Sequence, residues 1–144
     1  MVHSSVKNYL HLIFATKNRE SVIPLELETR LHDYFGGIAK KQNVPILKVN
    51  GTDDHIHMLI RLHPSVALSI MVKELKSYST GWIKKERFKE FSWQEGYGAF
   101  SCSQTHLDAL IKYIDNQKEH HKIYSFKDEI EKLNNMWGTT WLRD

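Results

Sequence analysis

The sequence predicts one α+β domain over residues 1–144, built on a βαββαβ core with added C-terminal helices. Short aliphatic runs alternate with longer segments of helical periodicity, and two of these runs are joined by the turn-like sequence GTDD. No repeat, low-complexity tract or linker divides the chain. This order of elements is typical of a ferredoxin-like (RRM-like) sandwich, in which the first and third strands are central and both helices cover one face of the sheet. The other face is then free for a further element.

Four strands are expected where aliphatic and aromatic residues gather. They cover residues 5–16, 44–50, 55–62 and 97–103, and the second and third form a hairpin across GTDD. Because side chains alternate along a strand, Ile56, Met58 and Ile60 share the face that suits packing under the helices. The opposite face of this third strand carries His55, His57, Leu59 and Arg61.

Four helices are expected where apolar residues recur at helical spacing. They begin after Pro24, at Ser65, at Thr105 and at Ser125, and the last one ends at about residue 135. Pro24 suits a first helical turn. Thr105 with Asp108, and Ser125 with Asp128, form capping-box patterns that predict the starts of the last two helices.

The composition is that of an ordinary globular protein, with 41% hydrophobic and 26% charged residues. The formal net charge of +3 permits a nucleic-acid partner without requiring one. A single cysteine, Cys102, excludes an internal disulfide and a four-thiol zinc site. No apolar run approaches a membrane span, and the N-terminal residues lack the pattern of a signal peptide, so we expect a cytoplasmic protein with no membrane partner.

His55 and His57 project from the same face of the third strand. Imidazoles at this spacing can converge on one metal ion, and histidine is a common metal ligand. Two ordinary polar residues on a half-exposed face are an equally good interpretation. A histidine-triad hydrolase would need a third histidine at position 59, which is leucine. His11 on the first strand could face the same site, or it could have a structural role.

Tyr113 and Gln117 lie one turn apart on a flank of the helix that begins at Thr105. If this helix covers the free face of the sheet, both residues lie over the histidine pair. Two imidazoles and an amide oxygen would suit Mn²⁺ or Mg²⁺, and the phenol could act as a nucleophile that forms a phosphotyrosine. The alternative is a half-packed boundary tyrosine. His120 and His121, at the end of this helix, could reach the site or simply lie near the negative end of its dipole.

Four sequence blocks together resemble a known family. The blocks are HLIFATKNR, DDHIHMLI, WQEGYGAFSCS and YIDNQKEHH, and the resemblance extends from about residue 8 to residue 131. They are similar to the single-tyrosine HUH transposases of the smallest insertion sequences, the insertion-sequence-200-like family. They are also similar to the related transposases associated with repetitive extragenic palindromes.

The resemblance implies a DNA transposase that cuts and rejoins single-stranded DNA near hairpins through a 5′-phosphotyrosine intermediate and a free 3′-OH. It implies that Tyr113 is the nucleophile on an added C-terminal catalytic helix, and that His55, His57 and Gln117 bind Mg²⁺ or Mn²⁺. Asp54, just before the histidine pair, could add an acidic group. Members of this family are commonly homodimers in which the catalytic helix can serve the partner's histidines.

Further basic residues are candidate contacts to DNA. They are Arg61 on the histidine face, and Lys73, Lys76 and Lys84 in a stripe opposite the apolar face of the second helix. Phosphates bind mainly through lysine and arginine, although a solvated helix face is the usual explanation of such a stripe.

Two other functions fit the same residues. One is a non-catalytic protein that binds nucleic-acid hairpins, a domesticated transposase, and the other is a metal-dependent phosphohydrolase that uses water, with Tyr113 in a structural role. A covalent DNA–protein adduct would separate the transposase from both. The second strand is largely apolar and is expected at a sheet edge, where it could pair with another chain. This feature and the family resemblance both predict a homodimer.

Overall fold

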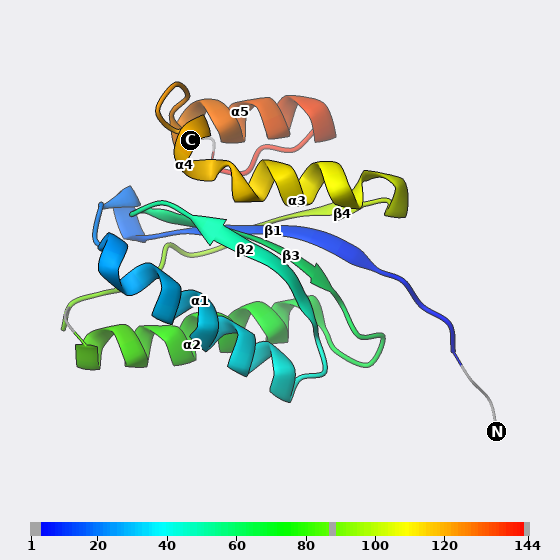
Figure 1. Ribbon diagram of the computed structural model, residues 1–144, viewed down its shortest axis with the longest axis horizontal. Coiled ribbons are helices and arrows are strands. Elements are labelled where there is room, and N and C mark those ends of the chain that lie inside the picture. The colour runs from blue at the N-terminus through cyan, green and yellow to red at the C-terminus, as the bar shows by residue number, and fades with distance from the viewer. Residues whose placement is uncertain (1–3, 87–88, 143–144) are drawn as a thin grey trace.

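The structure, a computed structural model, describes residues 4–86 and 89–142 and confirms the α+β architecture (Figure 1). The strands are β1 (Tyr9–Ala15), β2 (Ile46–Gly51), β3 (His55–Arg61) and β4 (Gly98–Cys102). The α-helices are α1 (Leu25–Lys41), α2 (Leu68–Glu86), α3 (Leu107–Asp115), α4 (Gln117–His120) and α5 (Phe126–Trp137), and short 3-10 turns cover Lys17–Arg19 and Gln104–His106. The predicted order of strands and helices is observed, except that the helix expected from Thr105 is divided at Asn116 into α3 and α4.

The four strands form one antiparallel sheet in the order β2-β3-β1-β4. As expected, β1 and β3 are central, and β2 lies at an edge. In the β1–β3 pair, Ala15 is opposite His55 and Ile13 is opposite His57. Because directly opposed residues in an antiparallel pair project to the same face, β1 and β3 together form the floor on which the histidines stand.

Helices cover both faces of the sheet (Figure 1). Helices α1 and α2 lie on one face, where the main core includes Phe14, Phe35, Met58 and Leu75. Helices α3, α4 and α5 lie on the other face (Figure 1). There, two smaller apolar clusters attach α5 through Phe126 and α3 through Ile114. The sequence left this second face free for a further element, and the C-terminal helices occupy it.

The starts of the C-terminal helices differ from each other. Ser125 Oγ accepts from the Asp128 amide at 3.0 Å and Asp128 Oδ2 accepts from the Ser125 amide at 3.4 Å, so the capping box predicted for α5 is confirmed. The capping box predicted at Thr105 is wrong, because a 3-10 turn precedes α3 and no side chain caps it. Thr105 Oγ1 instead lies 3.0 Å from Ser103 Oγ, in the turn itself.

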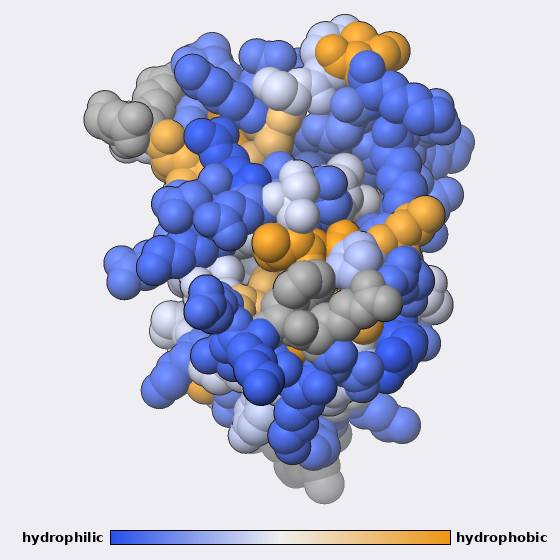
Figure 2. Space-filling view, turned by 90° about the vertical axis from the view of Figure 1, so that its left-hand side faces the viewer, coloured by the Kyte–Doolittle hydropathy of each residue, from blue (hydrophilic) through white to orange (hydrophobic). Residues whose placement is uncertain are grey.

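The side of the molecule that is at the left in Figure 1 is mainly hydrophilic, with a small apolar area near its centre (Figure 2).

Within residues 4–86 and 89–142, no helix combines the length and the apolar character that crossing a membrane requires.

Candidate metal and nucleophile site

His55 and His57 are fully buried between the sheet and the C-terminal helices, each with 0% of its surface exposed. The Nδ1 atom of His55 lies 2.7 Å from Asp54 Oδ1 and 2.9 Å from Thr52 Oγ1. The Nδ1 atom of His57 lies 2.7 Å from His11 Nε2, so His11 does face the site. Partners on Nδ1 orient an imidazole and leave its Nε2 for another ligand, as is usual around metal-binding histidines.

Burial disfavours the charged form of His11 and His57. Burial lowers the pKa of His57 to about 4, although Glu129 opposes the shift. Burial, together with the nearby His57, lowers the pKa of His11 to about 3. A metal ion binds the neutral form of histidine, so the local environment favours the form that a ligand requires.

Helices α3 and α4 bring Tyr113 and Gln117 over the histidine pair of the same chain. Gln117 is fully buried, and its Oε1 lies 3.3 Å from His55 Nε2. The Tyr113 ring centroid is 5.8 Å from that of His57. Tyr113 also lines a surface hollow of about 480 Å³ together with Lys112 and Asn116. The four residues selected from the sequence are thus brought together.

Two anchors hold the end of α3 in this position. Ile114 is fully buried and packs with Tyr9 and Leu59 of the central strands. Asn50 of β2 donates through Nδ2 to the carbonyl oxygens of Ile114 and Asp115, both at 3.1 Å. These carbonyls lie at the helix C-terminus, where intrahelical donors are lacking.

The site contains two further residues, which the sequence did not single out as ligands. In the part of the chain that the structure describes, one group of possible metal ligands consists of His55, His57, His121 and Glu129, with ligand atoms all within 4.8 Å of one another. The sequence left two roles open for His120 and His121. His121 belongs to this group of possible ligands, and His120 Nε2 lies 3.4 Å from Glu129 Oε2. Glu129 was missed, although a signal existed: it interrupts the apolar face that Phe126 and Ile130 define on α5, and it is only 4% exposed.

Burial, hydrogen bonds and neighbouring charges together set the charge states of Glu129 and Tyr113. Burial alone would raise the pKa of Glu129, but hydrogen bonds from His121 and His57 outweigh it and hold the pKa well below its ordinary value. Burial and the negative charge of Glu129 raise the pKa of Tyr113, whose hydroxyl donates to Glu129 Oε2. The site therefore contains a carboxylate beside a protonated phenol.

The donor atoms suit a divalent ion. Imidazole nitrogens, a carboxylate oxygen and the Gln117 amide oxygen form a mixed nitrogen and oxygen set, which transition ions such as Mn²⁺ accept. The residues present therefore fit the metal that the family resemblance implies, without distinguishing Mg²⁺ from Mn²⁺.

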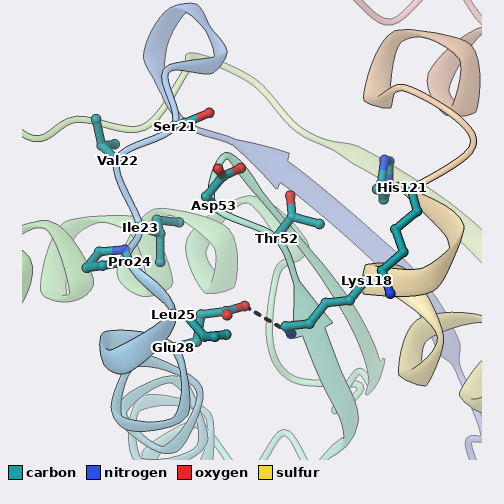
Figure 3. A pocket seen from close by; sticks show the side chains of 11 residues that line it. Ser21, Val22, Ile23, Pro24, Leu25, Glu28, Thr52, Asp53, Lys118 and His121 are labelled. Carbon is teal, nitrogen blue, oxygen red and sulfur yellow. Dashed lines mark ion pairs between the residues drawn. The ribbon is translucent and has the colours of Figure 1, made fainter.

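A cavity of about 450 Å³ borders the site on the side of His121 (Figure 3). It lies between the N-terminal end of α1, the β2–β3 turn and α4, and Lys118 crosses it to pair with Glu28 at 3.2 Å. His121 is the member of the ligand group that lines this cavity, which is separate from the hollow beside Tyr113.

The lysines proposed as DNA contacts do not border this site. Lys73, Lys76 and Lys84 lie on α2, which covers the opposite face of the sheet (Figure 1). The Lys76 ammonium donates to the carbonyl oxygens of Gln94 at 2.7 Å and Gly96 at 2.5 Å, so it also has partners within the chain. Arg61 is half-buried at the end of β3, the strand that carries the histidines.

Comparison with known proteins identifies the family. Residues 4–117 match the family described as "Transposase IS200 like", and the chain belongs to this family of transposases. It is 26% identical to the ISDra2 transposase TnpA of Deinococcus radiodurans over 116 residues, which cover 76% of this chain and 83% of that protein. It is 25% identical to the transposase for insertion sequence element IS200 of Salmonella typhimurium over 130 residues, 85% of each chain.

Two solved structures share the fold. A putative transposase from Deinococcus radiodurans superimposes with a TM-score of 0.65 at 24% identity, over 81% of this chain and 96% of that one. A REP-associated tyrosine transposase bound to a REP hairpin superimposes with a TM-score of 0.63 at 16% identity, over 84% and 73% of the two chains. At these identities, the likeness confirms the fold.

Proposed function

We propose that this transposase cleaves and rejoins single-stranded DNA near hairpins, with Tyr113 as the nucleophile. The observation that carries the proposal is the position of Tyr113: its hydroxyl donates to Glu129, a member of a cluster of possible metal ligands, and the residue also lines a surface hollow. His55, His57 and Gln117 are the metal ligands that the family resemblance implies. His55 and His57 belong to this cluster, and Gln117 Oε1 lies 3.3 Å from His55 Nε2. The structural relative that is bound to a REP hairpin supports a nucleic-acid partner.

The proposed reaction exchanges one phosphate ester for another. The Tyr113 hydroxyl gives up its proton as its oxygen attacks the scissile phosphorus. The bond from phosphorus to the 3′ oxygen breaks, and the departing oxygen gains a proton to become a free 3′-OH, so no net proton is released. The 5′ phosphate remains bound to Tyr113, so that the reverse reaction with another 3′-OH rejoins the strand. A divalent ion in the site would polarise the phosphate and orient the leaving oxygen. The surrounding side chains orient the phenol and exclude bulk water.

The test is incubation with end-labelled single-stranded hairpin DNA and Mn²⁺, followed by a denaturing gel. We expect a covalent protein–DNA adduct that protease digestion removes. Tyr113→Phe keeps the packing of the ring and deletes the nucleophilic oxygen, so it should bind the hairpin normally and form no adduct. Undiminished cleavage by this variant would refute the assignment of Tyr113.

The same gel separates the two alternative functions. A non-catalytic hairpin-binding protein would leave the DNA intact, and a phosphohydrolase that uses water would cut it without an adduct. The presence of a phenol beside a buried cluster of imidazoles does not favour the non-catalytic alternative.

We also propose that the chain forms a homodimer. The strand β2 lies at a sheet edge, and Leu47 on it is 37% exposed. Exposed edges pair readily with a second chain, and two-fold dimers are the commonest oligomers. Light scattering at micromolar concentration without DNA tests this proposal: a mass of one chain that stays unchanged on concentrating the protein would refute it.

A further inference from the structure

Glu129 makes more contacts to the site than any residue chosen from the sequence. Its Oε1 lies 2.8 Å from His57 Nε2 and 3.2 Å from His121 Nε2. Its Oε2 accepts from the Tyr113 hydroxyl and, at 3.1 Å, from Gln117 Nε2. One oxygen therefore faces the imidazoles, while the other faces the nucleophile and the amide.

The helix that carries Glu129 is held rigidly. Its N-terminus is fixed by the Ser125 capping box, and its apolar face packs through Phe126 and Ile130 against β1 and β4. The Phe126 ring also stacks on the ring of His55 with centroids 4.2 Å apart. Burying a carboxylate is costly unless it is paired, so a glutamate at this position requires the four donors that surround it. Helix α5 thus directs the Glu129 carboxylate to the site and packs its apolar side chains against the sheet.

Glu129 and His121 lie outside residues 4–117, the segment that matches the family description. The match ends at residue 117, whereas the second pair of ligand atoms comes from residues 121 and 129.

We propose that Glu129 and His121 complete the metal site, and that Glu129 also positions the nucleophile. One carboxylate oxygen is a ligand of the divalent ion together with His55, His57 and His121, and the other holds the Tyr113 hydroxyl beside the ion. The second part rests on the proposed function, whereas the first concerns metal binding only. The carboxylate adds a negative charge to a set of neutral ligands, which strengthens binding of a divalent cation.

Calorimetry with MnCl₂ on the full-length protein, freed of metal with a chelator, tests the ligand role. Glu129→Gln keeps the size of the side chain and removes its charge. We expect its Mn²⁺ affinity to fall by at least about tenfold, the lower end of the usual effect of disturbing a metal site. The control is Glu131→Gln, on an exposed position of the same helix, which should bind Mn²⁺ like the wild type. Wild-type affinity in Glu129→Gln would overturn the ligand role.

A second variant covers the case in which Glu129→Gln does not fold, as judged by circular dichroism. His121→Asn removes the least buried imidazole of the group, whose side chain is 12% exposed, and should also weaken Mn²⁺ binding. Unchanged Mn²⁺ affinity in this variant would overturn the proposed ligand set.

Single-turnover cleavage at saturating Mn²⁺ tests the positioning role. We expect Glu129→Gln to bind hairpin DNA like the wild type but to cleave it at least about tenfold more slowly, because the phenol loses its charged acceptor. A wild-type cleavage rate would overturn this role. If the wild-type protein binds Mn²⁺ through Glu129 yet forms no DNA adduct, the proposed function fails and the metal site stands. If the wild-type protein forms the DNA adduct but Glu129→Gln binds Mn²⁺ with unchanged affinity, the proposed function stands and the ligand role of Glu129 fails.

Discussion

The attachment of the tyrosine helix to the sheet depends on Ile114, and Ile114→Ala should loosen it. Ile114 is fully buried and is the one residue of α3 that is buried in its cluster, with Tyr9 and Leu59 below it. Truncating a buried isoleucine to alanine costs about 2–5 kcal/mol. The neighbouring α3 residues in this cluster are only partly buried and can relax into the space that the substitution leaves. We therefore expect a loss of stability in the lower half of this range, about 2–3 kcal/mol.

The loss should appear first in α3 itself. Because 1.4 kcal/mol corresponds to a factor of ten, amide hydrogen exchange in α3 should become roughly 30- to 150-fold faster. Exchange in α2, on the other face, should change less, and adduct formation by Tyr113 should slow. The control is Ile123→Ala, because Ile123 is 78% exposed and its loss should change stability by no more than about 0.5 kcal/mol. Equal effects of the two variants, or unchanged exchange in α3, would refute this account of how the nucleophile is positioned.

Three other predictions follow from single side chains. His57→Ala should weaken Mn²⁺ binding in calorimetry far more than hairpin binding, which depends mainly on phosphate contacts; equal losses would contradict this. Ser125→Ala removes the α5 cap and should lower the unfolding free energy in urea by about 1 kcal/mol, whereas exposed Ser101→Ala should not. Burial, with a smaller contribution from Lys118, lowers the pKa of His32 from 6.5 to about 4. Between pH 6.5 and pH 4, His32 therefore binds a proton in the unfolded chain but not in the folded chain. The free energy of unfolding consequently falls as the pH drops through this range. His32→Gln should therefore reduce the stability lost between pH 7 and pH 5 by about 1 kcal/mol after allowance for partial exposure; an unchanged pH dependence would exclude this origin.

The elements of the fold could be predicted because each has a local cause. Alternation along residues 55–62 placed the histidines on one face and Ile56, Met58 and Ile60 in the core on the other, as the structure confirms. The start of α5 followed from the side chains of Ser125 and Asp128, which interact within one turn. The start of α3 did not, because Thr105 bonds within the preceding turn and leaves the helix uncapped. Local hydrogen-bonding groups with two possible partners cannot be assigned from spacing alone.

By itself, the sequence determined which residues of β3 and of the tyrosine helix could form a site, since strand and helix periods fix the direction of neighbouring side chains. Only the tertiary structure decided that Glu129 joins them. Its position depends on the path of residues 121–125 and on the packing of Phe126 and Ile130 against the sheet, which no local period specifies. The same packing turned His121 toward Glu129, at 3.2 Å, and settled a choice that its place at the end of a helix had left open. Convergence of side chains that are distant in sequence is a property of the packed core, because only packing fixes the distance and angle between elements.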